Sequence, residues 1–476
     1  MKNSITPKEE NFSQWYIDLV LKAKLADYAP VKGCMVIRPN GYHLWENIQK
    51  NLDRMFKESG HVNAYFPLLI PESFIQKEKE HMEGFSPECA VVTHGGGKKL
   101  KEPLFIRPTS ETIIWSMYAR WITSYRDLPL LINQWCNIVR WELRPRLFLR
   151  TLEFLWQEGH TAHETYEEAE KEALKMLGIY KKFVEEYMAI PVYEGQKSES
   201  ERFAGALKTY TIEALMQDGK VLQAGTSHDL GQNFARAFDV KFATREGGED
   251  YVWATSWGVS TRLIGALIMA HADNRGIIIP PKLASLPVVV VPIYYSASER
   301  SKVLSFIQSL CLNLRKDFNI KIDDREEYRP SFKFNEWELQ GIPLRIEVGP
   351  KDVEKKQAVL VRRDTGEKIS VSLNEVSSRI PALLDEIQKN IFKKAKKFKE
   401  ENTFKIDTFE DFQKIISDKG GFISAHWCGS PECEAKIKSV TTATLRCIPF
   451  HNEKEKGKCV YCGGKSSQRV LFAKAY

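Results

Sequence analysis

Hydrophobic and polar positions alternate along the chain with two different periods. Between 31 and 284, short strand-like stretches rich in tryptophan alternate with amphipathic helical ones. Two prolines, Pro280 and Pro281, then interrupt any continuing helix. Beyond them a second series is predicted, with strands at 286–292, 320–323, 343–348 and 357–362 and helices at 298–316 and 331–340. Strands and helices that alternate at this spacing predict a small, mostly parallel α/β sheet.

The length of 476 residues allows about three domains with sizeable cores. The pattern divides the chain into an N-terminal helical segment (1–30), a large mixed region (31–284), a smaller α/β domain (285–385) and a cysteine-rich C-terminal region (386–476). The predicted fold class is therefore α/β or α+β.

Charge and composition limit the partners and the cellular compartment that we expect for the chain. The net charge of +7 suits a nucleic-acid partner but does not require one. The segment 1–10 has no apolar signal-peptide core and no apolar run is long enough to span a membrane, so we expect a cytoplasmic protein without a membrane partner. Five of the nine cysteines follow residue 427, which in a cytoplasmic chain favours metal binding over disulfides.

Two segments with alternating side chains predict an antiparallel hairpin that carries charge and aromatic rings on one face. The first strand is expected at 132–142, where Arg140 and Glu142 share a face. The returning segment, 150–160, places five more side chains on one face: Arg150, Phe154, Trp156, Glu158 and His160. A solvated face with salt bridges is the alternative, but the interleaved aromatic residues and the preference of arginine for phosphate and carboxylate groups favour a binding site.

The spacing Arg140-x-Glu142, a loop, then Arg150-x3-Phe154 resembles the second signature motif of the class II aminoacyl-tRNA synthetases. The resemblance implies that Arg140 binds the α-phosphate of ATP and stabilises the charge that develops as pyrophosphate leaves. It implies that Glu142 binds the adenine amine and that Phe154 stacks on the base. Arg150 is expected to contact ATP as well.

A second arginine, Arg262, lies in the first turn of a helix expected at 260–271, where free N–H groups favour an anion. This segment is similar to the third signature motif of the same family, whose arginine holds the γ-phosphate. Only Gly258 remains of the usual preceding glycines. The first signature motif fits 65–71, an apolar strand that ends in proline and that lies at the dimer interface in the family.

The sequence Arg107-Pro-Thr109-Ser-Glu111 precedes an amphipathic helix at 112–125 and could cap it through Thr109 or Ser110. The segment also resembles a substrate-binding loop of the class IIa synthetases. That resemblance implies that Thr109 and Glu111 bind the ammonium group of an amino-acid substrate and that Arg140 binds its carboxylate.

Further segments make the chain similar to the prolyl-tRNA synthetases of the archaeal and eukaryotic type: His81-Met-Glu-Gly-Phe85, Trp156-Gln-Glu-Gly-His160-Thr-Ala-His163, Gln223-Ala-Gly-Thr226-Ser-His228 and Thr255-Ser-Trp257-Gly258. A small proline pocket needs flat apolar walls, for which Phe85, Trp156 and Trp257 are candidates. The resemblance implies that His228 contacts proline. It also implies that Gln223 and Thr226 contact ATP, with Gln223 facing Mg²⁺.

The resemblance covers the whole chain and implies a catalytic domain with an antiparallel sheet flanked by helices, an α/β anticodon-binding domain and a C-terminal zinc domain. In the anticodon-binding domain the candidates for reading bases or phosphates are Glu336, Arg345, Lys351 and Asp352. Surface charge without any role in binding is the alternative for each of these four residues.

Two cysteine pairs in the C-terminal region, Cys428-x4-Cys433 and Cys459-x2-Cys462, have the spacing of a tetrahedral zinc site. Four thiolate ligands indicate a closed, structural site rather than a catalytic one, and free thiols are the alternative. The resemblance also implies that the carboxylate of Tyr476 reaches the active site.

Together these observations predict a homodimeric enzyme that uses ATP and Mg²⁺ to activate L-proline as prolyl-adenylate and then transfers it to the 3′ end of tRNA(Pro). A threonine-specific class IIa synthetase is one alternative, although no Cys/His set for its catalytic zinc lies among the motifs. An inactive paralogue that only binds tRNA or a partner protein is the other, and the intact set of Arg140, Glu142, Arg262 and Glu111 is evidence against it.

Overall fold

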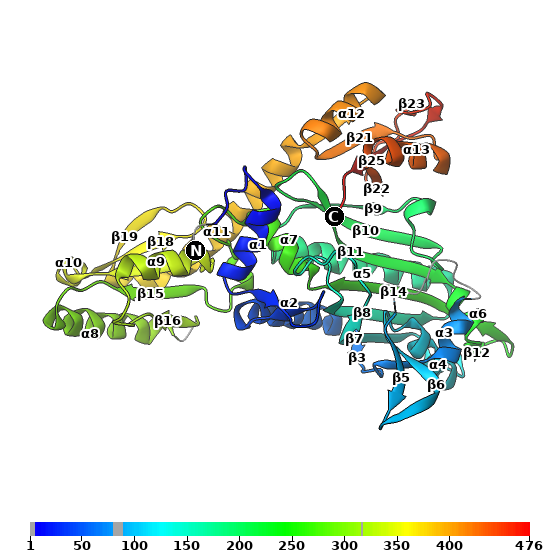
Figure 1. The fold of residues 1–476 in the computed structure, drawn as a ribbon, viewed down its shortest axis with the longest axis horizontal. Coiled ribbons are helices and arrows are strands. Elements are labelled where there is room, and N and C mark those ends of the chain that lie inside the picture. The colour runs from blue at the N-terminus through cyan, green and yellow to red at the C-terminus, as the bar shows by residue number, and fades with distance from the viewer. Residues whose placement is uncertain (1–4, 80–88, 316–317) are drawn as a thin grey trace.

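The computed structural model describes residues 5–79, 89–315 and 318–476. Figure 1 shows three parts: a large sheet with its helices, a smaller sheet at the left, and a C-terminal part above the large sheet. No helix within these described ranges is long and apolar enough to cross a membrane.

The large sheet has eleven strands in the order β20-β21-β25-β22-β9-β10-β11-β14-β8-β7-β3. Apart from the parallel pairs at its two ends, β20–β21 and β3–β7, neighbouring strands are antiparallel. The seven strands that come from the region before residue 285 are β3 (Val62–Asn63), β7 (Leu130–Val139), β8 (Glu153–His163), β9 (Val192–Gln196), β10 (Lys208–Leu215), β11 (Val221–Gly231) and β14 (Trp253–Ser260).

Long amphipathic helices cover one face of this sheet. In α2, Pro39 occupies the first turn, where its missing N–H costs nothing, and Leu44, Ile48 and Leu52 form a buried stripe at helical spacing. In α5, the side chain of Thr165 accepts a hydrogen bond from the Glu168 N–H and caps the helix. The helices of this region are α1 (Phe12–Lys22), α2 (Pro39–Glu58), α3 (Glu72–Lys79), α4 (Glu111–Trp121), α5 (Tyr166–Glu186), α6 (Asn233–Ala237) and α7 (Arg262–His271).

Three small sheets surround the large one. They pair β1 with β2, β12 with β13, and β4 and β5 with β6. Their bounds are β1 (Ala26–Tyr28), β2 (Met35–Ile37), β4 (Leu69–Pro71), β5 (Val91–Gly95), β6 (Lys98–Ile106), β12 (Lys241–Ala243) and β13 (Glu249–Tyr251). Single 3₁₀ turns occur at Tyr125–Asp127, Glu199–Glu201 and Pro281–Leu283.

The second region contains the strands and helices that the sequence predicts for it. The predicted elements are β15 (Val288–Pro292), α8 (Ala297–Leu314), β16 (Ile320–Ile322), α9 (Pro330–Leu339), β17 (Leu344–Val348) and β18 (Gln357–Arg362). The structure adds α10 (Pro350–Glu354), β19 (Lys368–Ser372) and the long helix α11 (Leu373–Glu401). The expectation of a mostly parallel sheet is wrong, because β15 pairs in parallel with β16 and β17 but β17–β18 and β18–β19 are antiparallel. The link between β17 and β18 is too short for the crossover that a parallel pair needs.

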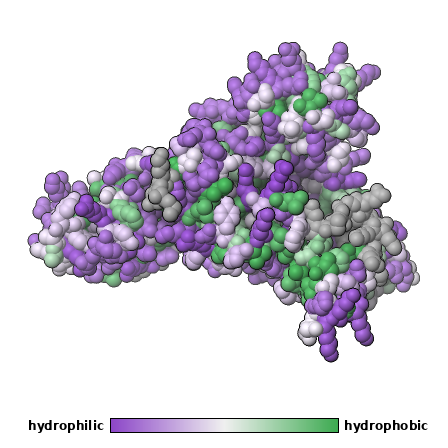
Figure 2. Space-filling view, in the orientation of Figure 1, coloured by the Kyte–Doolittle hydropathy of each residue, from purple (hydrophilic) through white to green (hydrophobic). Residues whose placement is uncertain are grey.

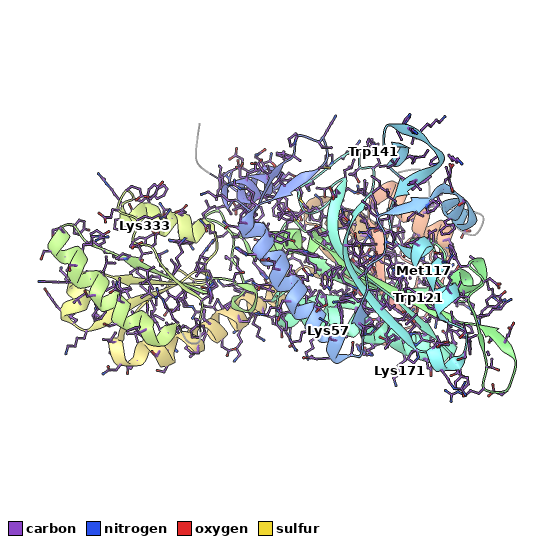
Figure 3. All side chains as sticks on the ribbon, turned by 90° about the horizontal axis from the view of Figure 1, so that it is seen from below. Lys57, Met117, Trp121, Trp141, Lys171 and Lys333 are labelled. Carbon is purple, nitrogen blue, oxygen red and sulfur yellow. The ribbon has the colours of Figure 1, made fainter. Side chains whose placement is uncertain are left out.

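The C-terminal part continues the large sheet. Its elements are β20 (Thr403–Ile406), α12 (Phe409–Asp418), β21 (Phe422–His426), α13 (Pro431–Thr441), β22 (Thr444–Pro449), β23 (Gly457–Lys458), β24 (Lys465–Ser466) and β25 (Arg469–Ala473). The strand β22 pairs directly with β9 of the region before residue 285. The expected boundary at 385/386 lies inside the uninterrupted helix α11. Figure 3 shows α2, whose last turn carries Lys57, lying between the smaller sheet and the large one.

Candidate active site

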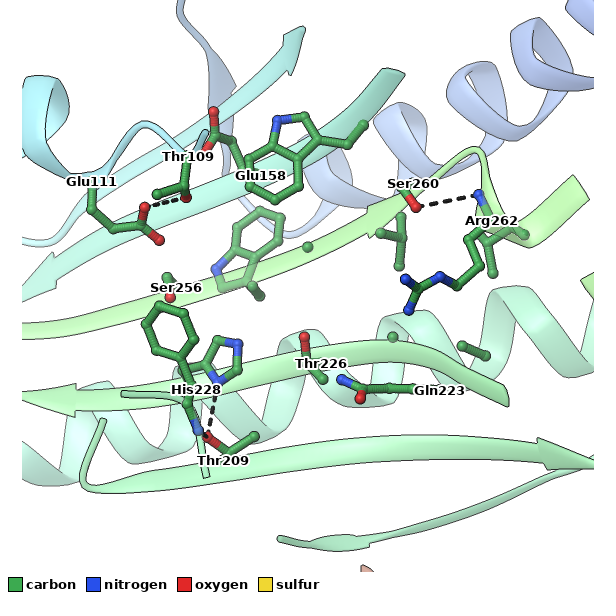
Figure 4. Close-up of a pocket in the computed structure, with 18 of the residues that line it drawn as sticks. Thr109, Glu111, Glu158, Thr209, Gln223, Thr226, His228, Ser256, Ser260 and Arg262 are labelled. Carbon is green, nitrogen blue, oxygen red and sulfur yellow. Dashed lines mark hydrogen bonds between the residues drawn. The ribbon is translucent and has the colours of Figure 1, made fainter. Parts of the chain in front are cut away.

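The face of the large sheet that α2 and α5 leave uncovered holds a cavity of about 330 Å³. Strands β8, β10, β11 and β14 form its floor, and the loop before α4 and the start of α7 form its two ends (Figure 4). Nine of the side chains that the sequence predicts for the site line it: Thr109, Glu111, Arg140, Phe154, Trp156, Gln223, Thr226, His228 and Arg262.

The hairpin of β7 and β8 brings Arg140 to the cavity. The strand β7 ends at Val139, one residue earlier than Arg140, so the expectation that Arg140 and Glu142 lie within the strand is wrong. The guanidinium of Arg140 donates from Nε to the Pro108 carbonyl at 2.9 Å. It also lies 5.3 Å from the centre of the Trp156 ring and 5.7 Å from that of Phe154. These contacts fix the orientation of the arginine.

Buried carboxylates form one end of the cavity. The Thr109 hydroxyl donates to Glu111, and the Ser110 hydroxyl donates to Glu158. Ser110 is the N-cap of α4 as predicted, but neither its side chain nor that of Thr109 makes the expected capping bond. Their hydroxyls serve the carboxylates instead, which makes this loop part of the cavity wall.

His160 links the two carboxylates of this end. Its Nε2 lies 3.2 Å from Glu158, and ligand atoms of Glu111, Glu158 and His160 all lie within 4.8 Å of one another. Burial alone lowers the pKa of His160, but the hydrogen bond with Glu158 and the charges of Glu111 and Glu158 outweigh it and raise the pKa. A protonated His160 offsets one of the two carboxylates, so this end carries a net negative charge that suits a cationic group.

His228 contributes an uncharged imidazole beside the carboxylates. Burial and the nearby His160 lower the pKa of His228 to about 3. Its Nδ1 lies 3.0 Å from the Thr209 hydroxyl, and its ring centre lies 4.6 Å from that of Phe203. A neutral His228 does not repel a cation bound next to it.

Positive charge collects at the opposite end. Arg262 is the first residue of α7, as predicted, and its Nε donates to the Leu149 carbonyl at 3.3 Å. Burial and the charges of Arg140 and Arg150 lower the pKa of Arg262 to about 10. Several guanidinium groups held together beside a helix N-terminus favour a bound anion.

Three predicted residues do not fit the expected arrangement. Glu142 and Arg150 do not line the cavity, and their side chains pair with each other at 3.0 Å. Trp141 in the loop between β7 and β8 is 53% exposed and lies at the outer edge of the molecule (Figure 3). Phe85 lies outside the described residues, as does the whole segment from His81 to Phe85.

Trp257 lines the cavity, but most of its ring contacts lie in the core. The ring packs with Phe56, His61 and Tyr180, whose ring centres lie 5.1, 5.1 and 6.3 Å away. Successive residues of a strand face opposite sides, so its neighbours Ser256 and Gly258 face the cavity instead. Trp156 lines the cavity as predicted.

The cavity residues that were not singled out from the sequence include Lys197, Glu201, Phe203 and Thr209. The first three belong to a polar segment between β9 and β10 that has neither helical nor strand periodicity. Its run of alternating serine and charged residues was the available signal, although such a run usually indicates a solvated loop.

Of the four candidate residues of the anticodon-binding region, three make contacts within the chain and one, Lys351, is exposed. Glu336 pairs with Arg325 at 2.6 Å, and Arg345 pairs with Glu347 at 2.9 Å. Asp352 accepts a hydrogen bond from the Gly349 N–H at 2.9 Å and so caps α10, whereas Lys351 is exposed.

The four predicted zinc ligands come together in the C-terminal part. The sulfur atoms of Cys428, Cys433, Cys459 and Cys462 all lie within 4.8 Å of one another, and those of Cys428 and Cys462 are 3.8 Å apart. Zinc–sulfur bonds of about 2.3 Å in a tetrahedron place the sulfurs about 3.8 Å from one another. The cluster therefore fits a zinc ion in both its donor set and its size.

Tyr476 packs beside the strand that carries Gln223. Its N–H donates to the Val221 carbonyl at 3.1 Å, and its hydroxyl donates to Asp218 at 2.6 Å. Its ring also lies 5.9 Å from the guanidinium carbon of Arg146. These contacts hold Tyr476 at the start of β11 but do not place it among the cavity-lining residues.

Comparisons with known proteins agree over the whole chain. Family models match the tRNA synthetase class II core domain (G, H, P, S and T) at residues 93–271, the anticodon binding domain at 287–383 and the C-terminal domain of prolyl-tRNA synthetase at 409–476. The proline–tRNA ligases of Chlorobium chlorochromatii and Chloroherpeton thalassium are each 59% identical, with both chains covered completely.

A solved structure extends this agreement to the fold. The crystal structure of prolyl-tRNA synthetase from Cryptosporidium parvum, complexed with halofuginone and AMPPNP, superposes with a TM-score of 0.96 at 41% identity, again covering both chains completely. Full-length identity at this level and a shared fold leave one conclusion: the chain belongs to the proline–tRNA ligase family.

Proposed function

We propose that the cavity is where this chain, a proline–tRNA ligase, activates L-proline with ATP. The observation that carries the proposal is the separation of charge along the cavity. Glu111 and Glu158 lie at one end and Arg262 lies at the other. Arg140 also lines the cavity: it donates to the carbonyl of Pro108, next to Thr109, and its charge lowers the pKa of Arg262. A secondary ammonium group fits the first end, polyphosphate fits the second, and the substrate carboxylate meets the α-phosphate beside Arg140.

The protein supplies position and charge rather than a nucleophile. Proline binds with its ammonium at Thr109 and Glu111 and with its ring against Trp156. Its carboxylate attacks the α-phosphate, which forms prolyl-adenylate and releases pyrophosphate. Arg140 stabilises the charge that grows on the α-phosphate, and Arg262 holds the γ-phosphate.

The remaining ATP contacts follow from the same orientation. Phe154 offers a flat ring for the adenine, and Gln223 and Thr226 reach the nucleotide from β11. Glu142 and Arg150 lie outside the cavity and pair with each other, so we propose that they contact ATP only after that loop moves. Mg²⁺ bound to the phosphates shields their charge, with Gln223 as the nearby protein oxygen.

ATP–pyrophosphate exchange with each amino acid in turn tests the proposal. We expect exchange with proline and a strong loss of it in Glu111→Gln, which keeps the size of the side chain but removes the charge. Exchange with threonine but not proline would overturn the specificity, and no exchange with any amino acid would indicate an inactive paralogue.

We propose that the Cys428, Cys433, Cys459 and Cys462 cluster holds a structural zinc ion, because four thiolates leave no open position for substrate. Metal analysis of the purified protein tests this assignment. We expect about one zinc per chain and its loss in Cys459→Ser. A protein that is fully folded and metal-free would contradict the proposal.

The second product-forming step transfers proline from the adenylate to the 3′-terminal hydroxyl of tRNA(Pro). We propose that the region 285–385 binds the anticodon, with Lys351 as the exposed cation among the four candidates.

Because tRNA is used in the cytoplasm, we place the protein there.

We propose a homodimer that forms through the segment of the first motif. Exposed apolar side chains gather there: Val62, Tyr65 and Leu69 are 60%, 72% and 39% exposed, and Val91 of β5 is 46% exposed. Figure 2 shows hydrophobic surface on this side of the catalytic region. Apolar side chains that gather in one patch, unlike single ones scattered over a surface, favour burial against a second copy.

A further inference from the structure

The segment 197–203, which links β9 to β10, forms part of the cavity wall at the amino-acid end. Lys197, Glu201 and Phe203 all line the cavity. The Phe203 N–H donates to the Thr209 hydroxyl at 3.0 Å, and the Phe203 ring lies against that of His228. The position of this segment therefore shapes the space beside the residues proposed to hold proline.

A buried group of charges ties the start of this segment to the C-terminal part. The ammonium of Lys197 lies 2.7 Å from Glu213 and donates to the Arg446 carbonyl, also at 2.7 Å. The Arg446 guanidinium binds the other oxygen of Glu213 at 2.9 and 3.1 Å. All three side chains are buried, and the single carboxylate of Glu213 binds both cations, so each charge depends on the others.

Strand pairing holds the same two regions in register. Arg446 belongs to β22, which pairs with β9 through Ile448 and Gln196 (Figure 1). A side chain at Gly195 would place its Cβ only 2.3 Å from the Ile448 carbonyl oxygen. The absence of a side chain at Gly195 therefore permits this close approach.

A second buried contact reaches the next residue of the segment. The Ser198 hydroxyl donates to Glu434 of α13 at 2.8 Å, and both residues are buried. A more exposed pair joins Lys438 of the same helix to Glu201 at 3.4 Å. Helix α13 thus contacts the segment at two points, one of which is a residue that lines the cavity.

From these contacts we propose that Ser198 and Glu434, which join the segment to the C-terminal domain, are positioning residues for the amino-acid pocket. They fix the segment 197–203 and so set the affinity for proline. Arg446 is not assigned this role, because its charge acts on that of Arg262 and its partner Glu213 lies opposite Gln223 in the sheet. The hydrogen bond between Ser198 and Glu434, in contrast, joins the segment to α13. The inference rests on the proposed function, because it assigns the amino-acid substrate to this end of the cavity.

Steady-state exchange kinetics of Ser198→Ala and Glu434→Ala test the proposal. Each variant removes one partner of a buried hydrogen bond to a charged group, so we expect the KM for proline to rise about tenfold in both. We expect the KM for ATP to stay within about twofold of the original value. In Glu434→Gln, the amide oxygen still accepts from Ser198, and the KM for proline should stay near that of the unchanged protein.

Lys436→Ala is the matched control, because Lys436 is exposed on the same helix. The double variant Ser198→Ala/Glu434→Ala should have a proline KM no higher than either single variant, since both remove the same contact. Ser198 is not one of the four cysteines, but its partner Glu434 follows Cys433, so the zinc content of each variant is measured as well and should equal that of the unchanged protein. An unchanged proline KM in both single variants, or an equal rise in the KM for ATP, would refute the proposal. Absence of exchange in the unchanged protein would instead count against the proposed function.

Discussion

At the scale of a single residue, the contacts of Arg140 explain how it is held in the cavity. Its backbone N–H donates to the Leu152 carbonyl at 2.8 Å, which continues the pairing of the β7–β8 hairpin past the end of β7. The aromatic rings of Phe154 and Trp156 then hold its guanidinium in place. The alternation along 150–160 correctly placed Phe154, Trp156, Glu158 and His160 on the cavity face, but it could not show that Arg150 precedes the strand and lies outside the cavity.

Arg140→Ala should lower the rate of ATP–pyrophosphate exchange by about 10²- to 10³-fold, because it removes the charge that faces the reacting phosphate. The cavity is open to solvent there, so the fold should survive, which thermal melting can confirm. Arg120→Ala is the control, because Arg120 is exposed at the end of α4. Exchange at the original rate in Arg140→Ala would contradict the proposed mechanism.

At the scale of the element, β14 shows what the sequence did not reveal. The segment 250–257 alternates as a strand should, but both faces of that strand are buried, one in the core and one in the cavity. Hydrophobicity therefore could not tell which face holds Trp257. The partner strand decides it: a side chain at Gly159 would meet the Trp257 ring at 2.1 Å, so the ring occupies the space that Gly159 leaves open.

Gly159→Ala should destabilise the protein by about 3 kcal/mol, because the new methyl group has no room and the Trp257 ring must move within a packed core. Urea unfolding measures this loss. Gly178→Ala is the opposite control: Gly178 is exposed within α5, nothing lies within 4 Å of its added Cβ, and alanine should stabilise the helix by about 0.5–1 kcal/mol. Equal effects of the two substitutions would show that the close contact at Gly159 is tolerated.

At the scale of the whole molecule, the order of the regions along the chain was predictable but their connection was not. The smaller α/β domain and the cysteine cluster both formed as the sequence patterns indicate. The pairing of β22 with β9 joins residues more than two hundred positions apart, which no local pattern records. The same long-range packing buries polar groups, histidines among them, that look unremarkable in the sequence.

Two of these histidines should make stability fall in mild acid. Burial lowers the pKa of His163 and of His271 to about 4, from the ordinary value of 6.5. The unfolded chain therefore takes up protons first as the pH falls. The stability that the neutral histidines contribute is complete above about pH 6.5 and is lost as the pH falls toward 4.

Together the pair should add about 3 kcal/mol per pH unit to the slope of unfolding free energy between pH 6 and pH 5. Urea titrations at the two pH values measure the slope. His271→Gln keeps a donor for the Met188 carbonyl but cannot take up a proton, so it should reduce the slope by about 1.4 kcal/mol per pH unit. An unchanged slope in that variant would contradict the assignment.

The position of β25 has a consequence for synthesis of the chain on the ribosome. This strand lies between β21 and β22 in the sheet but follows both of them in the sequence. Until β22 emerges, β9 is an unpaired edge of the catalytic sheet, and until β25 emerges, β22 has no partner on its other side. Exposed strand edges are sites where nascent chains associate wrongly. The edge strand β9 of the catalytic region is therefore covered only by β22, which is translated after all the strands of that region.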